Sequence, residues 1–447
     1  MKSIKNTIVG LSLVASVLSV ASCEDFLDLQ PTGSIVADNA ISDAKTARGA
    51  VIGVYAQLKS LNFGGGSIHL LGTMPGDNVE FSGSLTQYQQ LDNNAYPTNN
   101  QVTVPVYQGL YSLINRANWV ISDIGKVTDP ALGEAEKKQL LGEAYFGRAY
   151  GYFELARGWG GVQIQTSPTT GLNVIKGVKR STQAETYAQA IADLTEAESL
   201  LPDDDAATRN RAQKSAARAL RARVHLYAGQ WAEAETYASQ VLANTAKYEL
   251  VKPYSSFFTA PYLTKESVFE LTFSASDQNR VTGWYPTQFG GSFEYRPTAE
   301  IVNILNNPAL AGSRSALIAT SNTGQVYNAQ LNRTGLDPVF LIRVAELYLI
   351  RAEARAKKAS PDLTGAIADL NAVRDRADIA AYSGANDAPS VLQAIEDERR
   401  IEFAFEPHRW YDLVRTKRVN DVLDAPVDEH FWLFPLPEAD VLADPDL

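Results

Sequence analysis

Two adjacent segments, residues 211–228 and 232–243, carry the pattern that most constrains the fold of this chain. Small and large residues alternate in them at helical spacing: Ala219, Leu220, Ala222, Tyr227, Ala228, Ala234, Tyr237 and Ala238. A turn at Gly229-Gln230-Trp231 separates the two segments. Small residues let two helices approach closely, and the large residues fill the spaces opposite them. The pattern therefore predicts a helical hairpin.

The same rhythm returns, less regularly, in residues 145–201 and 344–376, so we count about four hairpins of the tetratricopeptide type. Gly or Pro stands at most of the predicted turns. Further predicted helices cover residues 38–61, 106–126, 134–157, 339–358 and 363–377. Stacked hairpins bury one continuous core, because each pair covers the open face of its neighbour. We therefore expect the Ala and Tyr positions to be packing sites.

A stretch near the C-terminus, residues 395–415, mixes charges of both signs with bulky aromatic residues. It predicts a helix, a turn near Pro407, and a second short helix with Trp410 and Val414. A solvated charged face is the first interpretation, and it suits Glu396, Asp397 and Arg400. A paired network beneath an aromatic layer, needed because unpaired buried charges are costly, suits Glu398, Arg399, Glu402 and Arg409. A catalytic pair of carboxylates is the third interpretation.

Two long segments, residues 62–105 and 246–338, interrupt the helices. Both are rich in Gly, Asn, Pro and Ser and lack a clear apolar period, so they are predicted to be irregular, with short strands such as 267–273. Five aromatic residues lie within residues 279–295, more than a connector needs for burial. Long loops inside compact proteins are usually functional or disordered. We therefore expect the binding function in these two segments.

The balance of charge limits the classes of partner. The chain has 40 Lys and Arg against 51 Asp and Glu, a formal net charge of −11. Nucleic acids are bound by clustered Lys and Arg, so none is expected here, whereas a neutral sugar is compatible with this charge. Four histidines without metal-like spacing and a single cysteine argue against a metal site. We expect no cofactor and no catalytic residue, because no GxSxG, HExxH or dinucleotide motif occurs, although the count of Asp and Glu leaves a glycosidase pair open.

The single cysteine, Cys23, follows a secretory signal. Lys2 and Lys5 precede an apolar run over residues 8–20, and small residues stand just before the cysteine. This run is too short to span a membrane as a stable helix. The arrangement resembles a bacterial lipobox, in which lipid is attached to the thiol. Residues 1–22 are therefore predicted to be a signal peptide and residues 23–447 a single domain, with an ordinary signal peptide and a chance cysteine as the alternative.

Five groups of residues, in order along the chain, resemble the SusD/RagB family of Bacteroidetes outer-membrane lipoproteins. They are the lipobox with residues 25–31, then residues 147–162, 342–354, 398–415 and 433–437. The chain departs from the family pattern in two places. Pro407 stands where the family more often has Gly, and the chain ends without the usual Asn-Pro-rich ending. Its length is also at the small end for the family, which favours trimmed loops and a smaller ligand.

The resemblance implies a mostly α-helical, SusD-like fold. About four tetratricopeptide-type hairpins would form one side, mainly residues 106–245 and 339–420, and a loop-rich ligand half with short strands the other, mainly residues 62–105 and 246–338. It also implies a lipid-anchored protein facing the cell exterior, which acts as a lid on a SusC-like TonB-dependent outer-membrane transporter. Such proteins capture oligo- or polysaccharide, or peptide in RagB-type members, and do no chemistry. A protein-binding tetratricopeptide scaffold and a glycan-cleaving enzyme are the alternatives from other classes.

Ligand contacts are poorly shared within that family, so the candidates here come from the chemistry of sugars. A sugar presents apolar C–H faces to aromatic rings and hydroxyl groups to amides and carboxylates. The aromatic candidates are Trp284 and Tyr285, followed by Tyr88, Tyr96 and Phe289. The polar candidates are Asp77, Asn78, Asn93 and Arg280. The alternative role for Trp284 is to pack the irregular segments against the helices.

Overall fold

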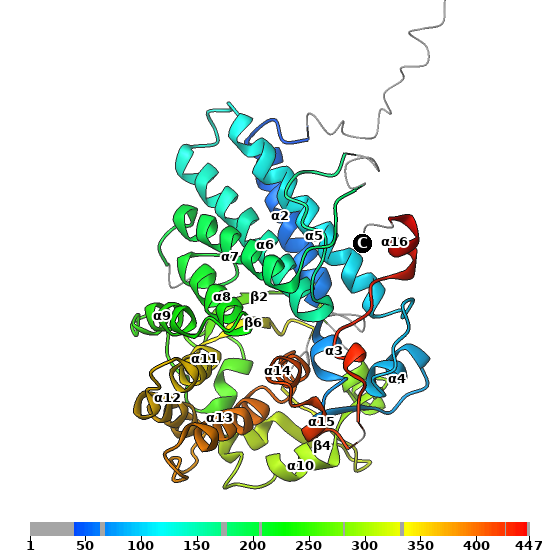
Figure 1. Cartoon of the computed structure of the whole chain (residues 1–447), viewed down its shortest axis with the longest axis vertical. Coiled ribbons are helices and arrows are strands. Elements are labelled where there is room, and N and C mark those ends of the chain that lie inside the picture. The colour runs from blue at the N-terminus through cyan, green and yellow to red at the C-terminus, as the bar shows by residue number, and fades with distance from the viewer. Residues whose placement is uncertain are drawn as a thin grey trace, which may run out of the picture.

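The computed structural model describes residues 40–444 except 63–67, 171–176, 205–207, 280–281, 331–334 and 425. The predicted signal peptide and Cys23 therefore lie outside the described residues. Long helices run from the top of Figure 1 to its lower left, beginning with α2 (Ala44–Asn62). Shorter elements and loops lie at the lower right of the same view, and we call this part the irregular half.

Four helix pairs succeed one another within the described chain, which confirms the predicted number of hairpins. They are α2 with α5 (Thr103–Asp123), α6 (Glu134–Trp159) with α7 (Gln183–Leu200), α8 (Lys214–Tyr227) with α9 (Trp231–Leu242), and α11 (Val344–Lys357) with α12 (Leu363–Arg376). Neighbouring pairs also touch, because α5 packs on α6, α7 on α8, and α9 on α11. The helices therefore form one continuous stack, which we call the helix array.

Local sequence explains where some of these helices begin. A capping box opens α7: the Thr182 hydroxyl accepts from the Glu185 amide, and the Glu185 carboxylate accepts from the Thr182 amide. Helix α13 (Ala388–Glu402) begins behind Asp387, whose carboxylate accepts from the Ser390 amide. These caps satisfy amide groups that a helix cannot pair internally.

The irregular half and the C-terminal region contain the short elements. The helices are α3 (Ile68–Thr73), α4 (Thr86–Asp92), α10 (Ala299–Leu305), α14 (Arg409–Thr416), α15 (Val419–Val422) and α16 (Glu438–Ala443). The 3-10 turns are η2 (Ile124–Lys126), η4 (Tyr254–Phe258), η5 (Thr282–Trp284), η6 (Thr287–Phe289), η7 (Gly312–Leu317) and η8 (Glu429–Phe431). The strands form antiparallel pairs: β1 (Val79–Phe81) with β3 (Tyr295–Pro297), β2 (Ser267–Leu271) with β6 (Val339–Arg343), and β4 (Ile318–Thr320) with β5 (Val326–Asn328).

Two details of the predicted secondary structure are wrong. Residues 62–105 are not irregular throughout, because α3, β1 and α4 lie there. The predicted helix over residues 339–358 begins only at Val344, since residues 339–343 form β6. Strand β6 pairs with β2, which is buried along its whole length. Residues 339–343 therefore form a strand because β2, which is remote in sequence, supplies their hydrogen-bond partners.

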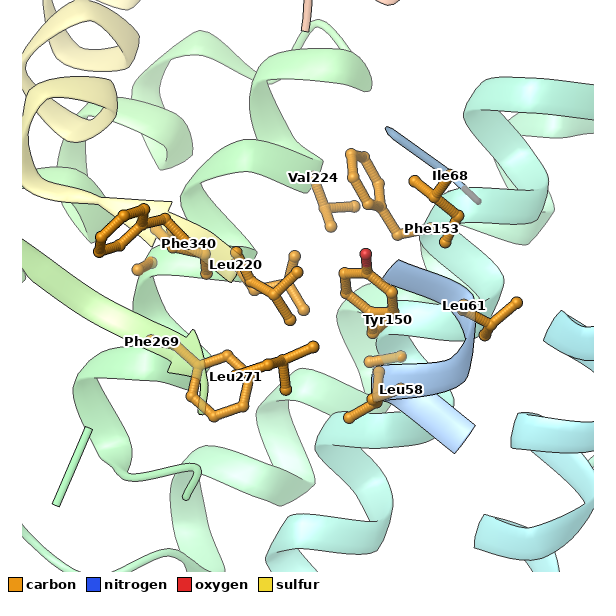
Figure 2. Close-up of a cluster of buried hydrophobic side chains, with 14 of the residues drawn as sticks. Leu58, Leu61, Ile68, Tyr150, Phe153, Leu220, Val224, Phe269, Leu271 and Phe340 are labelled. Atoms are coloured by element: carbon orange, nitrogen blue, oxygen red, sulfur yellow. The ribbon is translucent and has the colours of Figure 1, made fainter. Parts of the chain in front are cut away.

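The main core lies where the β2–β6 pair meets the helix array. Figure 2 shows buried side chains of α2, α6, α8 and the two strands pointing toward one another. The labelled residues on these elements are Leu58, Leu61, Tyr150, Phe153, Leu220, Val224, Phe269, Leu271 and Phe340. Helix α8 touches both strands and packs on α9. The small residues of the hairpin pattern on these two helices, Ala219, Ala222, Ala234 and Ala238, are completely buried, which agrees with the predicted close approach of the helices.

A cluster of buried charges joins the C-terminal elements, and we call it the ionic cluster. Its members are Arg314, Arg343, Arg376, Glu266, Glu398, Glu402 and Glu406. Glu402 lies at its centre: its carboxylate is 2.9 Å from Arg343 Nη1 and 3.4 Å from Arg314 Nη1, and it also contacts Arg376. Burial alone would raise the pKa of Glu402, but the three guanidinium groups hold that pKa below its ordinary value. The carboxylate is therefore ionised inside the protein.

The four residues predicted to form a paired network are all buried and paired, which confirms that interpretation. Glu398 and Glu402 belong to the ionic cluster. Arg399 Nε donates to Asp412 at 2.8 Å, and Arg409 Nε donates to a carboxylate of the irregular half at 2.6 Å. Helix α14 follows the turn at Pro407, also as predicted.

The predicted solvated face is only partly present. Asp397 is exposed, as expected. The Arg400 side chain is only 12% exposed and pairs with Asp77 at 2.8 Å and Glu300 at 2.7 Å. The prediction for Arg400 is therefore wrong, because the irregular half packs over this face of α13 and supplies carboxylates to it. It is wrong for Glu396 as well, whose side chain is 17% exposed and lies 3.5 Å from both Arg409 and Arg418.

Replacing the central carboxylate should destabilise the protein strongly. Glu402→Gln is expected to lower the free energy of unfolding by about 3–5 kcal/mol, because it leaves buried arginines without their shared countercharge. Urea denaturation measures this. Asp397→Asn removes a charge from an exposed position of the same helix and should change the stability by less than about 0.5 kcal/mol. Equal, small effects of the two substitutions would contradict the role given to Glu402.

Candidate functional site

Trp284, the first aromatic candidate, is completely buried. Its ring makes edge contacts with His69, Tyr295 and Phe405, at centroid distances of 5.6, 5.5 and 6.0 Å. Burial lowers the pKa of His69 to about 4, so this imidazole is neutral around pH 7. A ring needs an accessible face to stack on a sugar. In this structure Trp284 instead packs the irregular half against the chain that follows α13.

Phe289 is the most accessible of the aromatic candidates, with 58% of its surface exposed. It ends η6, and Gly290 follows it in the left-handed conformation, with φ 78°. The Phe289 ring lies 5.5 Å from the half-buried ring of Tyr327 on β5, which lies 6.1 Å from that of Tyr285. We call Tyr285, Phe289 and Tyr327 the aromatic patch. Sequence reasoning missed Tyr327, whose one signal was an aromatic residue in an Asn- and Gly-rich segment.

Tyr88 and Tyr96 pack within the irregular half. Tyr88 on α4 is half-buried, and its ring lies 5.9 Å from that of Phe81 on β1 and 5.4 Å from that of Tyr295 on β3. Tyr96 is buried, and its hydroxyl donates to the carbonyl of Phe431. These contacts tie α4 and the loop after it to the strands and to the C-terminal segment.

Asp77 and Asn78 bind the irregular half to α13 and to the turn after it. Asp77 accepts from Arg409 Nε and Nη2 at 2.6 and 2.9 Å and pairs with Arg400 at 2.8 Å. Burial acts to raise the pKa of Asp77, but Arg409 and Arg400 hold it below its ordinary value. Asn78 is fully buried and donates to the carbonyls of Arg400 and Ala404, both at 3.2 Å. The polar groups of both residues are occupied by the scaffold, which suits positioning of the surface around them.

Asn93 lies on a groove of about 500 Å³, which we call the acidic groove. Its walls come from the loop after α3, from Asp92, Asn93 and Asn94 at the end of α4, and from the segment 423–431 without residue 425. Its volume lies within the roughly 300–1,000 Å³ that ligand sites usually have. Sequence reasoning identified Asn93 but missed the opposite wall, because nothing local relates α4 to the C-terminal segment.

The acidic groove is lined by carboxylates. Asp92, Asp424 and Asp428 all contribute, and its described lining residues include no Lys or Arg. Burial raises the pKa of Asp92 to about 6. Phe431 adds an aromatic wall. The arrangement can accept hydrogen bonds from hydroxyl or amino groups while an apolar face of the ligand rests on the ring.

Two of the predicted functional residues, Arg280 and Cys23, lie outside the described residues. The part of the chain that the structure describes contains no group of His, Cys, Asp or Glu that could hold a metal ion. Among the helices it describes, none combines the length and apolar character that a membrane crossing requires.

Truncating the buried tryptophan should test its role in packing. Trp284→Ala is expected to destabilise the protein by about 3–5 kcal/mol, because it leaves a cavity among His69, Tyr295 and Phe405. Phe289→Ala removes an exposed ring from the same segment and should cost less than about 1 kcal/mol. Thermal and urea denaturation compare the two variants. A Trp284→Ala variant as stable as the Phe289→Ala variant would contradict the packing described.

Comparison with known proteins gives two family models that match in chain order. A SusD-like model described as starch-binding and associating with the outer membrane matches residues 25–226, and the SusD family model matches residues 319–432. Curated relatives agree. SusD-like protein P2 of Formosa agariphila is 25% identical, with 92% of this chain and 91% of the relative covered. A SusD-like protein of Bacteroides ovatus is 24% identical, with 90% and 81% covered.

Solved structures show the same fold. A SusD superfamily protein of Bacteroides vulgatus superposes with a TM-score of 0.79 at 21% identity, covering 90% of this chain and 98% of the other. A laminarin-binding SusD-like protein gives a TM-score of 0.78 at 20% identity, again covering 90% and 98%. The SusD-like fold expected from the sequence is thereby confirmed. The two family models together cover the helix array except α9, and also the C-terminal stretch of mixed charges, and the chain belongs to the SusD/RagB family.

Proposed function

We propose that this protein is a cell-surface glycan-binding lipoprotein that captures oligo- or polysaccharide and delivers it to a SusC-like TonB-dependent transporter of the outer membrane. The match to the starch-binding, outer-membrane-associated family over residues 25–226 carries the proposal. The laminarin-binding protein of the same fold supports a glycan ligand. The lipobox-like sequence at Cys23 supports an anchor at the outer surface, with residues 1–22 removed and residues 23–447 forming one domain.

The irregular half is the proposed ligand face. Phe289 offers the exposed ring on which the C–H face of a sugar stacks, with Tyr327 beside it and Tyr285 at the edge. Asn93 and the carboxylates of the acidic groove accept hydrogen bonds from hydroxyl groups. Arg280, in the same aromatic segment, stays a candidate contact.

Asp77 and Asn78 attach this face to α13 and the turn after it through hydrogen bonds. Trp284, Tyr88 and Tyr96 pack inside the irregular half and support the same face. Capture requires no bond to be broken. The closely spaced carboxylates Glu402 and Glu406 are both occupied by Arg343 in the protein interior. A hydrolytic pair must instead reach the scissile bond of the sugar. The protein is therefore proposed to bind its ligand unchanged.

A ligand panel with a matched pair of variants tests the capture of glycans. Calorimetry of residues 23–447 against oligosaccharides, with peptides as a second set, should find at least one bound glycan. Phe289→Ala should weaken that binding by about 1–3 kcal/mol, or about 5- to 150-fold in Kd. Ile52→Ala, which removes an equally exposed apolar side chain (62%) from α2, should leave it unchanged.

Three results of the panel would contradict glycan capture, each in favour of a different alternative. Binding of peptides alone would indicate a RagB-type lid, and binding of neither set a protein-binding scaffold. Release of shortened sugars during incubation would indicate an enzyme.

The anchor and the transporter partner are tested in cells. Cys23→Ser should shift the protein out of the membrane fraction, because one oxygen replaces the sulfur that carries the lipid. Ser22→Ala is the control and should stay with the membrane. Affinity purification of the wild type from solubilised outer membranes should recover a TonB-dependent barrel. A Cys23→Ser variant that remains membrane-bound, or a wild type that purifies without a barrel, would contradict the respective part of the proposal.

A further inference from the structure

One amide oxygen in the wall of the acidic groove has no hydrogen-bond partner among the residues that the structure describes. Asn94 is 7% exposed, and its Nδ2 donates to the carbonyl of Pro75 at 3.1 Å. Its Oδ1 is buried and accepts no hydrogen bond from any described residue. Buried polar groups are nearly always paired, because leaving one unpaired costs free energy. Asn94 therefore contributes to the groove an acceptor that a donor group of a ligand would satisfy.

Asp92, two residues earlier, contributes a second acceptor, and no Lys or Arg of the described chain forms an ion pair with its carboxylate. Its carboxylate is partly shielded from water and accepts from the backbone amide of Phe81. The nearest cation that acts on it, Arg296, is bonded to Glu80 at 2.6 Å. Burial raises the pKa of Asp92 to about 6, the Phe81 amide opposes that rise, and the charge of Glu80 adds to it. A cation placed against this carboxylate would relieve the cost of its burial.

The opposite wall adds negative charge as well. Asp424 and Asp428 line it, and the imidazole Nδ1 of His430 lies 2.7 Å from Asp428. With no Lys or Arg among the described lining residues, the groove offers acceptors and few donors. Its field attracts an ammonium group and repels a carboxylate or sulfate.

We propose that the acidic groove binds an amino sugar, with the ammonium group between Asp92 and Asn94, and rejects uronic and sulfated sugars. This inference rests on the proposed function, because it names the class of glycan that the protein captures. The N–H bonds of an ammonium group match two acceptors of the groove: the Asp92 carboxylate, which no described cation contacts, and Asn94 Oδ1, which accepts from no described donor. Phe431 covers the apolar face of the same sugar ring. A uronate in this position would face the carboxylates of both walls.

Three oligosaccharides of equal length test the charge preference. They are oligomers of glucosamine, of N-acetylglucosamine and of galacturonic acid, titrated by calorimetry at about 0.15 M salt. The glucosamine oligomer should bind at least about tenfold more tightly than the acetylated one, and the galacturonate should show no binding. Equal affinity for the amine and the acetylated sugar, or binding of the galacturonate, would overturn the inference.

Two variants locate the effect in the groove. Asp92→Asn keeps the shape of the side chain and should remove the preference for the amine, leaving the affinity for the acetylated oligomer in place. Asp424→Asn should reduce the preference from the opposite wall without a change in α4. Asp397→Asn removes the same charge from α13, outside the groove, and should have no effect. An unchanged preference in both groove variants, with circular dichroism confirming that each is folded, would overturn the inference.

The pH dependence gives an independent readout. Asp92 in the free protein takes up a proton as the pH falls through about 6, and the neutral carboxyl no longer attracts the amine. The amine titrates too, so the measured quantity is the difference in affinity between the wild type and Asp92→Asn at each pH. That difference should shrink as the pH falls from about 7 to about 5. A constant difference would overturn the assignment to Asp92.

The outcomes separate this inference from the proposed function. If the protein binds another glycan but not the glucosamine oligomer, the inference fails and the proposed function stands. If no glycan of either panel binds, both fail.

Discussion

A single carboxylate, that of Glu402, pairs with arginines from three separate elements. Arg314 comes from η7, Arg343 from β6 and Arg376 from α12. Separating any of these elements would leave a charge unpaired in an apolar interior, which is far more costly than losing a surface ion pair. Glu266, just before β2, extends the junction through its contact with Arg343 at 3.1 Å. The helix array and the strands at its centre therefore meet at one electrostatic junction.

The turn that follows α13 connects this ionic cluster to the proposed ligand face. Arg409, which begins α14, donates hydrogen bonds to the Asp77 carboxylate of the irregular half. The two parts approach so closely that a side chain at Gly72 on α3 would meet the backbone of Pro407 at 2.6 Å. Pro407 restricts the backbone of the turn that receives this contact. The shape of the surface proposed to bind sugars thus depends on buried contacts beneath it, which a ligand does not reach.

Local patterns predicted much of this molecule, because helix formation depends on residues three and four positions apart. The hairpins follow from the spacing of Ala and Tyr, and the buried network from charges set among aromatic residues. Strand β6 could not be predicted, since its hydrogen bonds come from β2. The burial of Trp284 could not be predicted either, because the rings that it contacts belong to three distant segments. The acidic groove is hidden in the sequence for the same reason.

The contact between Asp77 and Arg409 joins residues 332 positions apart in the chain. During synthesis the helix pairs can form one after another, since each hairpin finds its partner nearby. The wall of the groove beside Asp77 must wait until almost the whole chain has emerged. The helix array can thus form step by step, whereas the complete acidic groove forms only when the C-terminal segment has been added. A chain that stops before α14 would keep most of its helices but would lack the C-terminal wall of the acidic groove.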